Sequence, residues 1–276
     1  MAAPTIGAQG IITSWTGTAN GNFLTQLGEH SATLTMDGGT TDRTAYAASL
    51  ASRAHGAGLR SWGGTITGRL LTSSTPQTGY AGSLAFSGSD MYNDHIRSWN
   101  MNIVAGEHDA TTYNASATAA GWKSFRPGLV SASGSYEALV DATNPLEHMF
   151  SAATSLPTGT FTLTSGNTLA ASVIPTQSSL AIPVGDLNSV TYSYQTSGAI
   201  TAAGTGNLWA AGTIPLPEWD ESGTDGVADT TLTFQAAASR TYAGAAFWTS
   251  VSITHNPASY IEVVITFRGS GALTIG

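Results

Sequence analysis

The sequence predicts an all-β chain with a minor helical part, organised as two related β-sandwich units. Short segments alternate apolar and polar residues, which is the pattern of half-buried strands. Glycine supplies 32 of the 276 residues and separates many of these segments, as expected where strands turn or bend. Parts of the sequence also repeat at long range, which indicates duplicated units. Many short strands with glycine-rich joints are typical of sandwiches and barrels.

The clearest strand pattern covers residues 130–140 and follows the dipeptide Pro127-Gly128. Pro followed by Gly predicts a type II turn immediately before the strand. One face of the strand is apolar, and the other carries Ser131, Ser133, Ser135 and Glu137. Comparable patterns predict strands at 11–15, 31–37, 65–71, 83–87, 97–105, 160–164, 169–176, 190–195, 231–235, 242–253 and 261–268.

Two short helices account for the helical part of the prediction. Asn144 suits an N-cap, Pro145 suits the first helical position and Glu147 adds negative charge to the first turn, so 145–152 is expected to be helical. The Ala and Leu content of 44–55 favours a second helix.

The long-range repeat has two parts. Residues 160–201 recur as 233–274 at a constant offset of 73 (233 minus 160) without a gap. Upstream, residues 32–46 recur as 99–113 at an offset of 67 (99 minus 32). After a three-residue slip, Gly58-Leu59 falls on Gly128-Leu129, and a weaker echo relates 9–12 to 81–84. The chain therefore contains two copies of a first half-unit followed by two copies of a second half-unit.

This order predicts one unit inserted into another. The later first half runs through a short connector into the earlier second half, so residues 78–204 would form one complete unit. Residues 1–77 and 205–276 would then combine into a discontinuous outer unit of the same fold. The sequence leaves open the other pairing, in which residues 1–77 join the earlier second half.

The composition favours a protein that assembles. Charged residues make up 9% of the chain, against roughly 25% in typical soluble domains, and buried subunit contacts are depleted in charge. A secreted or Thr-rich β protein is the alternative. The net charge is −8 without a basic run, which disfavours tight binding of DNA or RNA. Cysteine is absent, and neither a signal-peptide pattern nor an 18-residue apolar span is found, so we expect synthesis in a cytoplasm and no membrane contact.

The sequence offers little chemistry, and we expect neither enzymatic activity nor a cofactor or metal. Nucleophile, phosphate-loop, dinucleotide and zinc motifs are not found. Adjacent residues of Glu107-His108-Asp109 would point to opposite faces of a strand and would not converge. Glu137 and Asp141 could form a glycosidase-like carboxylate pair. Because three serines share their strand face without an aromatic sugar platform, a solvated or interface face is the favoured interpretation.

The tract 214–229 combines two prolines with several acidic residues, which predicts a loop leading back to the outer unit. A solvated linker is the favoured interpretation, and a specific contact arm is the alternative. The candidate contact residues are Glu218, Asp220, Glu221 and Asp225.

One stretch resembles a known family. It reads Trp122-Lys123-Ser124-Phe125-Arg126-Pro127-Gly128-Leu129, then small residues, Gly134-Ser135-Tyr136-Glu137 and Asp141, and it follows Asp109-Ala110-Thr111-Thr112-Tyr113. This pattern resembles the tail tube proteins of long-tailed bacteriophages. The resemblance covers the inserted unit best and departs in the outer unit, where Ala57-Gly58-Leu59 stands in place of Pro127-Gly128-Leu129.

The resemblance implies a role in a virion tail. Tail tube modules are β-sandwiches that form sixfold rings, in which neighbouring sheets join into one inner barrel, and the rings stack into a hollow tube for the genome. With two modules in each chain, we expect three chains in a ring with pseudo-sixfold symmetry, and a ring of six chains is the competing arrangement. The implied partners are other copies of the chain and the tape-measure, terminator and tip proteins, with assembly in the cytoplasm of a host bacterium.

The lumen of such a tube would let DNA pass without tight binding, because few cations would face the phosphates. Candidate lumen or assembly residues on polar strand faces are Asn100, Asn102, Ser131, Ser133, Ser135, Glu137, Thr191, Ser193 and Gln195. Two other functions are carried as alternatives. One is a capsid decoration or tail-tip β-protein, and the other is a carbohydrate-binding or hydrolytic β-sandwich.

Overall fold

The fold is described from a computed structural model. The structure describes residues 12–15, 27–42, 55–72, 75–76, 82–87, 95–111, 121–140, 156–164, 167–204, 231–237 and 240–276. Every regular element within these ranges is a β-strand, which confirms the all-β prediction. The helix predicted at 145–152 lies outside the described residues. The helix predicted at 44–55 also lies outside them except for His55, which begins a strand.

In the part of the chain that the structure describes, fourteen strands form one antiparallel sheet. They are β1 (Ile12–Trp15), β2 (Leu27–Asp42), β3 (His55–Thr72), β4 (Thr75–Pro76), β5 (Ser83–Ser87), β6 (Ile96–Asp109), β7 (Phe125–Leu139), β8 (Thr158–Thr164), β9 (Asn167–Ala181), β10 (Ser189–Gly204), β11 (Thr231–Ala237), β12 (Arg240–His255), β13 (Glu262–Gly269) and β14 (Thr274–Ile275). Each predicted strand overlaps one of these, although many of the observed strands extend further.

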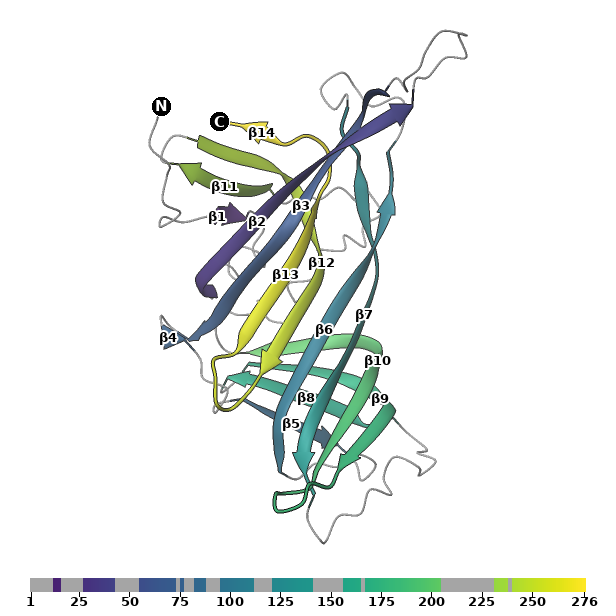
Figure 1. The fold of residues 1–276 in the computed structure, drawn as a ribbon, viewed down its shortest axis with the longest axis vertical. Helices are drawn as coiled ribbons and strands as arrows, with labels where there is room; N and C mark the ends of the chain where they lie inside the picture. The colour runs from purple at the N-terminus through teal and green to yellow at the C-terminus, as the bar shows by residue number, and fades with distance from the viewer. Residues whose placement is uncertain are drawn as a thin grey trace.

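The long strands β2, β3, β13, β12, β6 and β7 lie side by side, while β10, β9, β8 and β5 curl away at one end and β11 and β1 curl over at the other (Figure 1). The β2–β3 and β6–β7 pairs both extend beyond this body toward the top of the view. The short strands β4 and β14 pair with β3 and β12.

Two sets of strands follow the same neighbour order. The outer set runs β2-β3-β13-β12-β11-β1, and the inner set runs β6-β7-β10-β9-β8-β5. Their registers agree as well, since Ile253 faces Val263 in the outer set and Leu180 faces Val190 in the inner set, both at the offset of 73 seen in the sequence. Strand β12 of the outer set also pairs with β6 of the inner set, which joins the two sets into one sheet.

The same hydrogen bond closes the end of both sets. The Thr274 hydroxyl donates to the Ala243 carbonyl oxygen at 2.8 Å in the outer set. In the inner set the Thr201 hydroxyl donates to the Ala170 carbonyl oxygen at 3.2 Å. Gly271 and Gly198 precede these threonines and both have positive φ angles, of 81° and 78°, a conformation that glycine adopts without steric cost.

The core forms where each set curls over its own long strands. In the outer set Phe234 of β11 packs on Phe267 of β13, with ring centroids 5.5 Å apart. In the inner set Phe161 of β8 packs on Tyr194 of β10 at 5.4 Å. The buried aromatic and aliphatic side chains of both sets belong to one continuous cluster, so burial of apolar surface stabilises the two sets together.

The turn predicted at Pro127-Gly128 is wrong, because these residues lie within β7. Ala105 faces Val130 and Glu107 faces Pro127, so β7 carries one extra residue at this point. Such a β-bulge tolerates proline, which has no N–H to donate to the ladder. The outer set has the same bulge, since Gly38 faces Arg60 and Thr40 faces Ala57.

Candidate assembly surfaces

All nine predicted strand-face residues lie on one polar face of the sheet, because directly paired residues point to the same side. One row across the strands runs Ser31, Thr67, Val264, Ser252, Asn102, Ser133 and Gln195. The next rows contain Thr254, Asn100, Ser135 and Ser193, then Glu137 and Thr191, and, on the other side, Ser250, Val104 and Ser131. The polar face is therefore continuous across both strand sets.

Asn100 of β6 is hydrogen-bonded to residues of β7 and β10. Its amide Nδ2 donates to the Ser135 hydroxyl at 2.7 Å, and the Ser135 backbone N–H donates to Asn100 Oδ1 at 3.2 Å. The Tyr194 hydroxyl donates to the Asn100 backbone carbonyl at 2.7 Å. Because burial raises the pKa of Tyr194, this hydroxyl keeps its proton and remains a donor.

A shallow hollow of about 630 Å³ opens on the polar face over β2, β3, β13, β12 and β6. It lies over Gly63, which has no side chain to fill it. Asp37, Glu107 and Arg268 also line it. Arg268 Nε lies 3.7 Å from Glu107 Oε2, so two of these three charges neutralise each other.

No group of three His, Asp or Glu side chains in the described residues is placed to hold a metal ion, and no helix there is long and apolar enough to cross a membrane. Glu107 contacts Arg268, whereas Asp109 contacts Lys123. Asp141, the proposed partner of Glu137, lies outside the described residues, as do Glu218, Asp220, Glu221 and Asp225 of the acidic loop.

The strand sets meet at a junction between β12 and β6, which pair from Ser250 opposite Val104 to His255 opposite Trp99. Side chains that point to the core at this junction are buried, including Val251 and Ile253 of β12 and Met101 and Ile103 of β6. The His255 ring stacks on Trp99 with centroids 5.3 Å apart and an interplanar angle of 4°. The junction thus has the packing of a protein interior.

A second contact joins the sets at residues 121–125, just before and at the start of β7. The Lys123 backbone N–H donates to the Arg60 carbonyl at 2.8 Å, and the Gly271 N–H donates to the Lys123 carbonyl at 2.9 Å. The Phe125 N–H donates to the Ser270 hydroxyl at 3.1 Å, and the Arg268 guanidinium lies 4.1 Å from the centre of the Phe125 ring. This segment therefore ties the inner set to β3 and to the end of β13 in the outer set.

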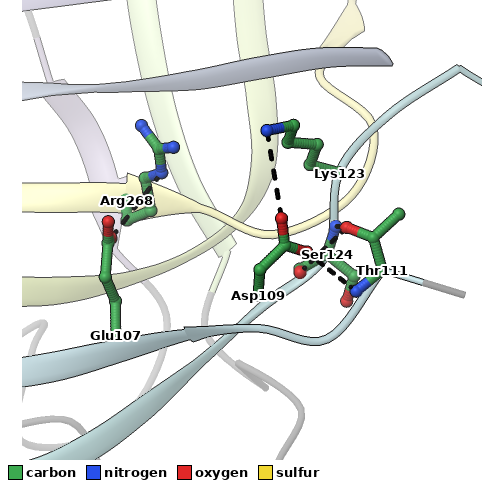
Figure 2. A network of polar contacts seen from close by, with 6 residues as sticks. All are labelled: Glu107, Asp109, Thr111, Lys123, Ser124 and Arg268. Atoms are coloured by element: carbon green, nitrogen blue, oxygen red, sulfur yellow. Dashed lines mark hydrogen bonds and ion pairs between the residues drawn. The ribbon is translucent and has the colours of Figure 1, made fainter.

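Polar side chains surround the second contact, as Figure 2 shows for Glu107, Asp109, Thr111, Lys123, Ser124 and Arg268. Hydrogen bonds from the hydroxyl and the backbone N–H of Thr111 hold the pKa of the Asp109 carboxyl below its ordinary value. The nearby charges of Lys123 and Arg268 act in the same direction, and partial desolvation opposes them. Ionised Asp109 thus contacts Lys123 in the segment that leads into β7.

Two strand edges at opposite ends of this arrangement lack the cover that the β12–β6 junction has. Among the described strands, β2 pairs only with β3, and β9 beyond Ser172 pairs only with β10. Apolar side chains are exposed along both edges: Met36 is 58% exposed on β2, while Leu180 and Ile182 are 41% and 69% exposed on and after β9. Exposed strand edges with apolar residues are templates for pairing with another chain.

Sequence reasoning named the polar face but missed the junction and the two edges. Trp99, Ile253 and His255 were part of predicted or repeated strands, without a role at a boundary. The signal was present in the repeat offsets, because they match each junction residue with an edge residue. The second contact coincides with the Trp122 to Phe125 motif that carries the family resemblance.

Comparison with known proteins yields weak structural similarities. No protein-family model matches the chain, and no curated protein matches it. It is similar to a solved structure described as the tail of an empty GTA particle with C6 symmetry, at a TM-score of 0.38 and 16% identity, over 45% of this chain and 97% of that chain. It is also similar to one from the virion of a native gene transfer agent particle, at a TM-score of 0.37 and 15% identity, over 50% of this chain and 99% of that chain.

Proposed function

We propose that the chain is a tail tube subunit of a phage-like particle. Each chain would contribute two modules of one fold, an outer one from residues 1–77 and 205–276 and an inserted one from 78–204. Three chains would close into a ring with pseudo-sixfold symmetry, and stacked rings would form a hollow tube through which a genome passes.

The observation that carries this proposal is the β12–β6 junction between two strand sets of the same order. The chain already joins one set to a second, related set edge to edge. Repeating the same step between chains adds further sets to the sheet, and a closed ring leaves neither the β2 edge nor the β9 edge unpaired. A ring explains the exposed apolar edges and the low content of charge together.

The polar face would line the lumen of this tube. Its rows consist mainly of Ser, Thr, Asn and Gln side chains, with few cations that could hold phosphates. The net charge of −8 adds a weak general repulsion for DNA. The implied partners are other copies of the chain, the tape-measure, terminator and tip proteins, and the proposed location is a virion tail assembled in a bacterial host.

Negative-stain electron microscopy of the purified full-length protein, over a range of concentrations, tests the proposal. We expect stacked rings with a central bore and threefold symmetry in averaged end views. Trimers that never stack would favour a capsid decoration or tail-tip protein instead. A monomer at every concentration that binds saccharides in calorimetry would replace the proposal with a carbohydrate-binding function.

A further inference from the structure

We propose that β9 of one chain pairs with β2 of a second copy, antiparallel and in one register, from Gln177 opposite Asp37 to Ile182 opposite Ala32. This inference rests on the proposed ring and names its contact between chains. The partner is therefore an identical chain, and the contact is head to tail, since β9 and β2 are different surfaces.

The register follows from the junction inside the chain. There, Ser252 of β12 faces Asn102 of β6. The offset of 73 places Ser252 on Ser179 of β9, and the offset of 67 places Asn102 on Thr35 of β2. Applied along the whole junction, the two offsets give the pairs Gln177–Asp37, Ser178–Met36, Ser179–Thr35, Leu180–Leu34, Ala181–Thr33 and Ile182–Ala32.

The pairing of β9 with its neighbours matches that of β12, which receives β6 at its edge. Strand β11 pairs with β12 up to Ala245, and β6 takes over the same edge from Ser250. Strand β8 pairs with β9 up to Ser172, the counterpart of Ala245. The edge of β9 from Gln177 onward is therefore at the position where β12 receives β6.

The side chains of both edges alternate as a new junction requires. Ile253 is 1% exposed where β6 covers it, whereas its counterpart Leu180 is 41% exposed. On the other side, Met101 is buried and its counterpart Leu34 is half-buried. Pairing in the proposed register would place Leu180 beside Leu34, and removing these apolar groups from water would favour association.

The remaining pairs fit the same two faces. Ile182 and Ala32 would meet where His255 and Trp99 stack, so a large pair inside the chain becomes a smaller apolar pair between chains. Ser179 and Thr35 would meet on the polar face, as their counterparts Ser252 and Asn102 do inside the chain. Gln177 would oppose Asp37, whose carboxylate can accept a hydrogen bond from the amide. None of the pairs opposes like charges.

A single chain does not satisfy both edges by pairing them with each other along the sheet. The strands between β2 and β9 in the sheet order are β3, β13, β12, β6, β7 and β10. Each chain therefore offers one β2 edge and one β9 edge to different neighbours, which is the arrangement that generates a ring or an open filament.

Disulfide trapping in the full chain tests the register. The protein has no cysteine, so Thr35→Cys combined with Ser179→Cys introduces the only two thiols. Directly opposed residues have Cα atoms about 4.5–5.5 Å apart, within disulfide range. As a matched control, Ser31→Cys with Ser179→Cys places the thiols four residues out of register, roughly 13 Å apart along the strand. Both chains are oxidised mildly and run on a non-reducing gel, and the same samples are imaged.

We expect covalent trimers from the Thr35→Cys pair and at least about a tenfold lower yield from the Ser31→Cys control, with rings in both samples. Rings without in-register cross-links, or with cross-links from the control pair instead, would overturn the inference while the tube function stands. In-register cross-linked oligomers that never form rings or tubes would support the contact and overturn the tube function. A chain that neither cross-links nor assembles would overturn both.

A charge at the same edge provides an independent test. Leu180→Lys would place a charge in the contact between chains but not in the core of the separate chain, so the variant remains folded. We expect its association to weaken by at least about tenfold in sedimentation, while Ile275→Lys, at an exposed position on β14, assembles like the parent. Normal association of folded Leu180→Lys would contradict the proposed edge.

Discussion

The outer and inner strand sets share an order and a register but differ in how their edges are covered. On β6 the residues Trp99, Met101 and Ile103 are buried against β12 and its surroundings. On β2 the corresponding Ala32, Leu34 and Met36 are only partly covered or exposed. The same apolar pattern is thus a core in one place and a surface in the other. The difference teaches that a strand's burial depends on its neighbour as much as on its own sequence.

The strongest way to test this comparison is to truncate the same position in both sets. Ile253→Ala removes a side chain that is buried in the junction and should destabilise the chain by about 2–5 kcal/mol. Leu180→Ala, its counterpart on the exposed edge, should cost less than about 1 kcal/mol in the unassembled chain. Urea unfolding of each variant, at concentrations where the chain is dissociated, measures both values.

The unfolding of Leu180→Ala in assembled material completes the test. If the β9 edge is covered on assembly, the loss of unfolding free energy caused by Leu180→Ala should rise toward the loss caused by Ile253→Ala. Equal costs in the dissociated chain would show that Leu180 is already buried there, and the comparison between a covered and an uncovered strand would fail.

Two glycines at corresponding positions offer the next test. A Cβ on Gly134 would lie 2.5 Å from the Tyr194 hydroxyl oxygen, and one on Gly64 would lie 2.8 Å from Cζ of Phe267. Each would also collide with the carbonyl oxygen of the neighbouring strand, at Asn100 and Thr33. We expect Gly134→Ala and Gly64→Ala to lower the free energy of unfolding by about 1–3 kcal/mol each.

Gly38→Ala is the control for these substitutions, because a Cβ there would meet no atom within 4 Å. Its unfolding free energy should stay within about 0.5 kcal/mol of the parent. If Ala is tolerated at only one of the two close-packed glycines, the strand sets are packed differently beneath their common register.

The sequence predicted the strands well and their interruptions poorly. Period-two alternation located β5, β6 and β13 to within a few residues, because one face of each strand is buried. Pro127-Gly128 was misread as a turn, since the same residues also suit a bulge inside a long strand, and only the partner strand decides between them. The polar face was predictable from alternation, whereas the two exposed edges follow from strand order, which period-two alternation does not contain.

Tyr194 and Phe267 allow a finer comparison, because they occupy corresponding positions and differ by one hydroxyl. Tyr194→Phe removes the 2.7 Å hydrogen bond to the Asn100 carbonyl and should cost about 1 kcal/mol in thermal or urea unfolding. Phe267→Tyr would direct a hydroxyl toward the Thr33 carbonyl, the counterpart of Asn100, and should be neutral or stabilising. A loss of more than about 1 kcal/mol in Phe267→Tyr would show that the outer set has no room for the inner set's hydrogen bond.

The smallest expected effect concerns the Asp109 carboxylate of the inner set. Hydrogen bonds from Thr111 lower its pKa in the folded chain, so ionised Asp109 stabilises the fold above the ordinary Asp pKa of about 4. This contribution is lost as the pH falls through the lowered pKa, because protonation removes the charge. Asp109→Asn should therefore unfold at a temperature lower by on the order of 1 °C at neutral pH, as for exposed ion pairs, and this difference should disappear as the pH falls below the lowered pKa. A difference that persists unchanged in acid would mean that Asp109 acts through packing, and that the charge at this contact does not help to hold the two sets together.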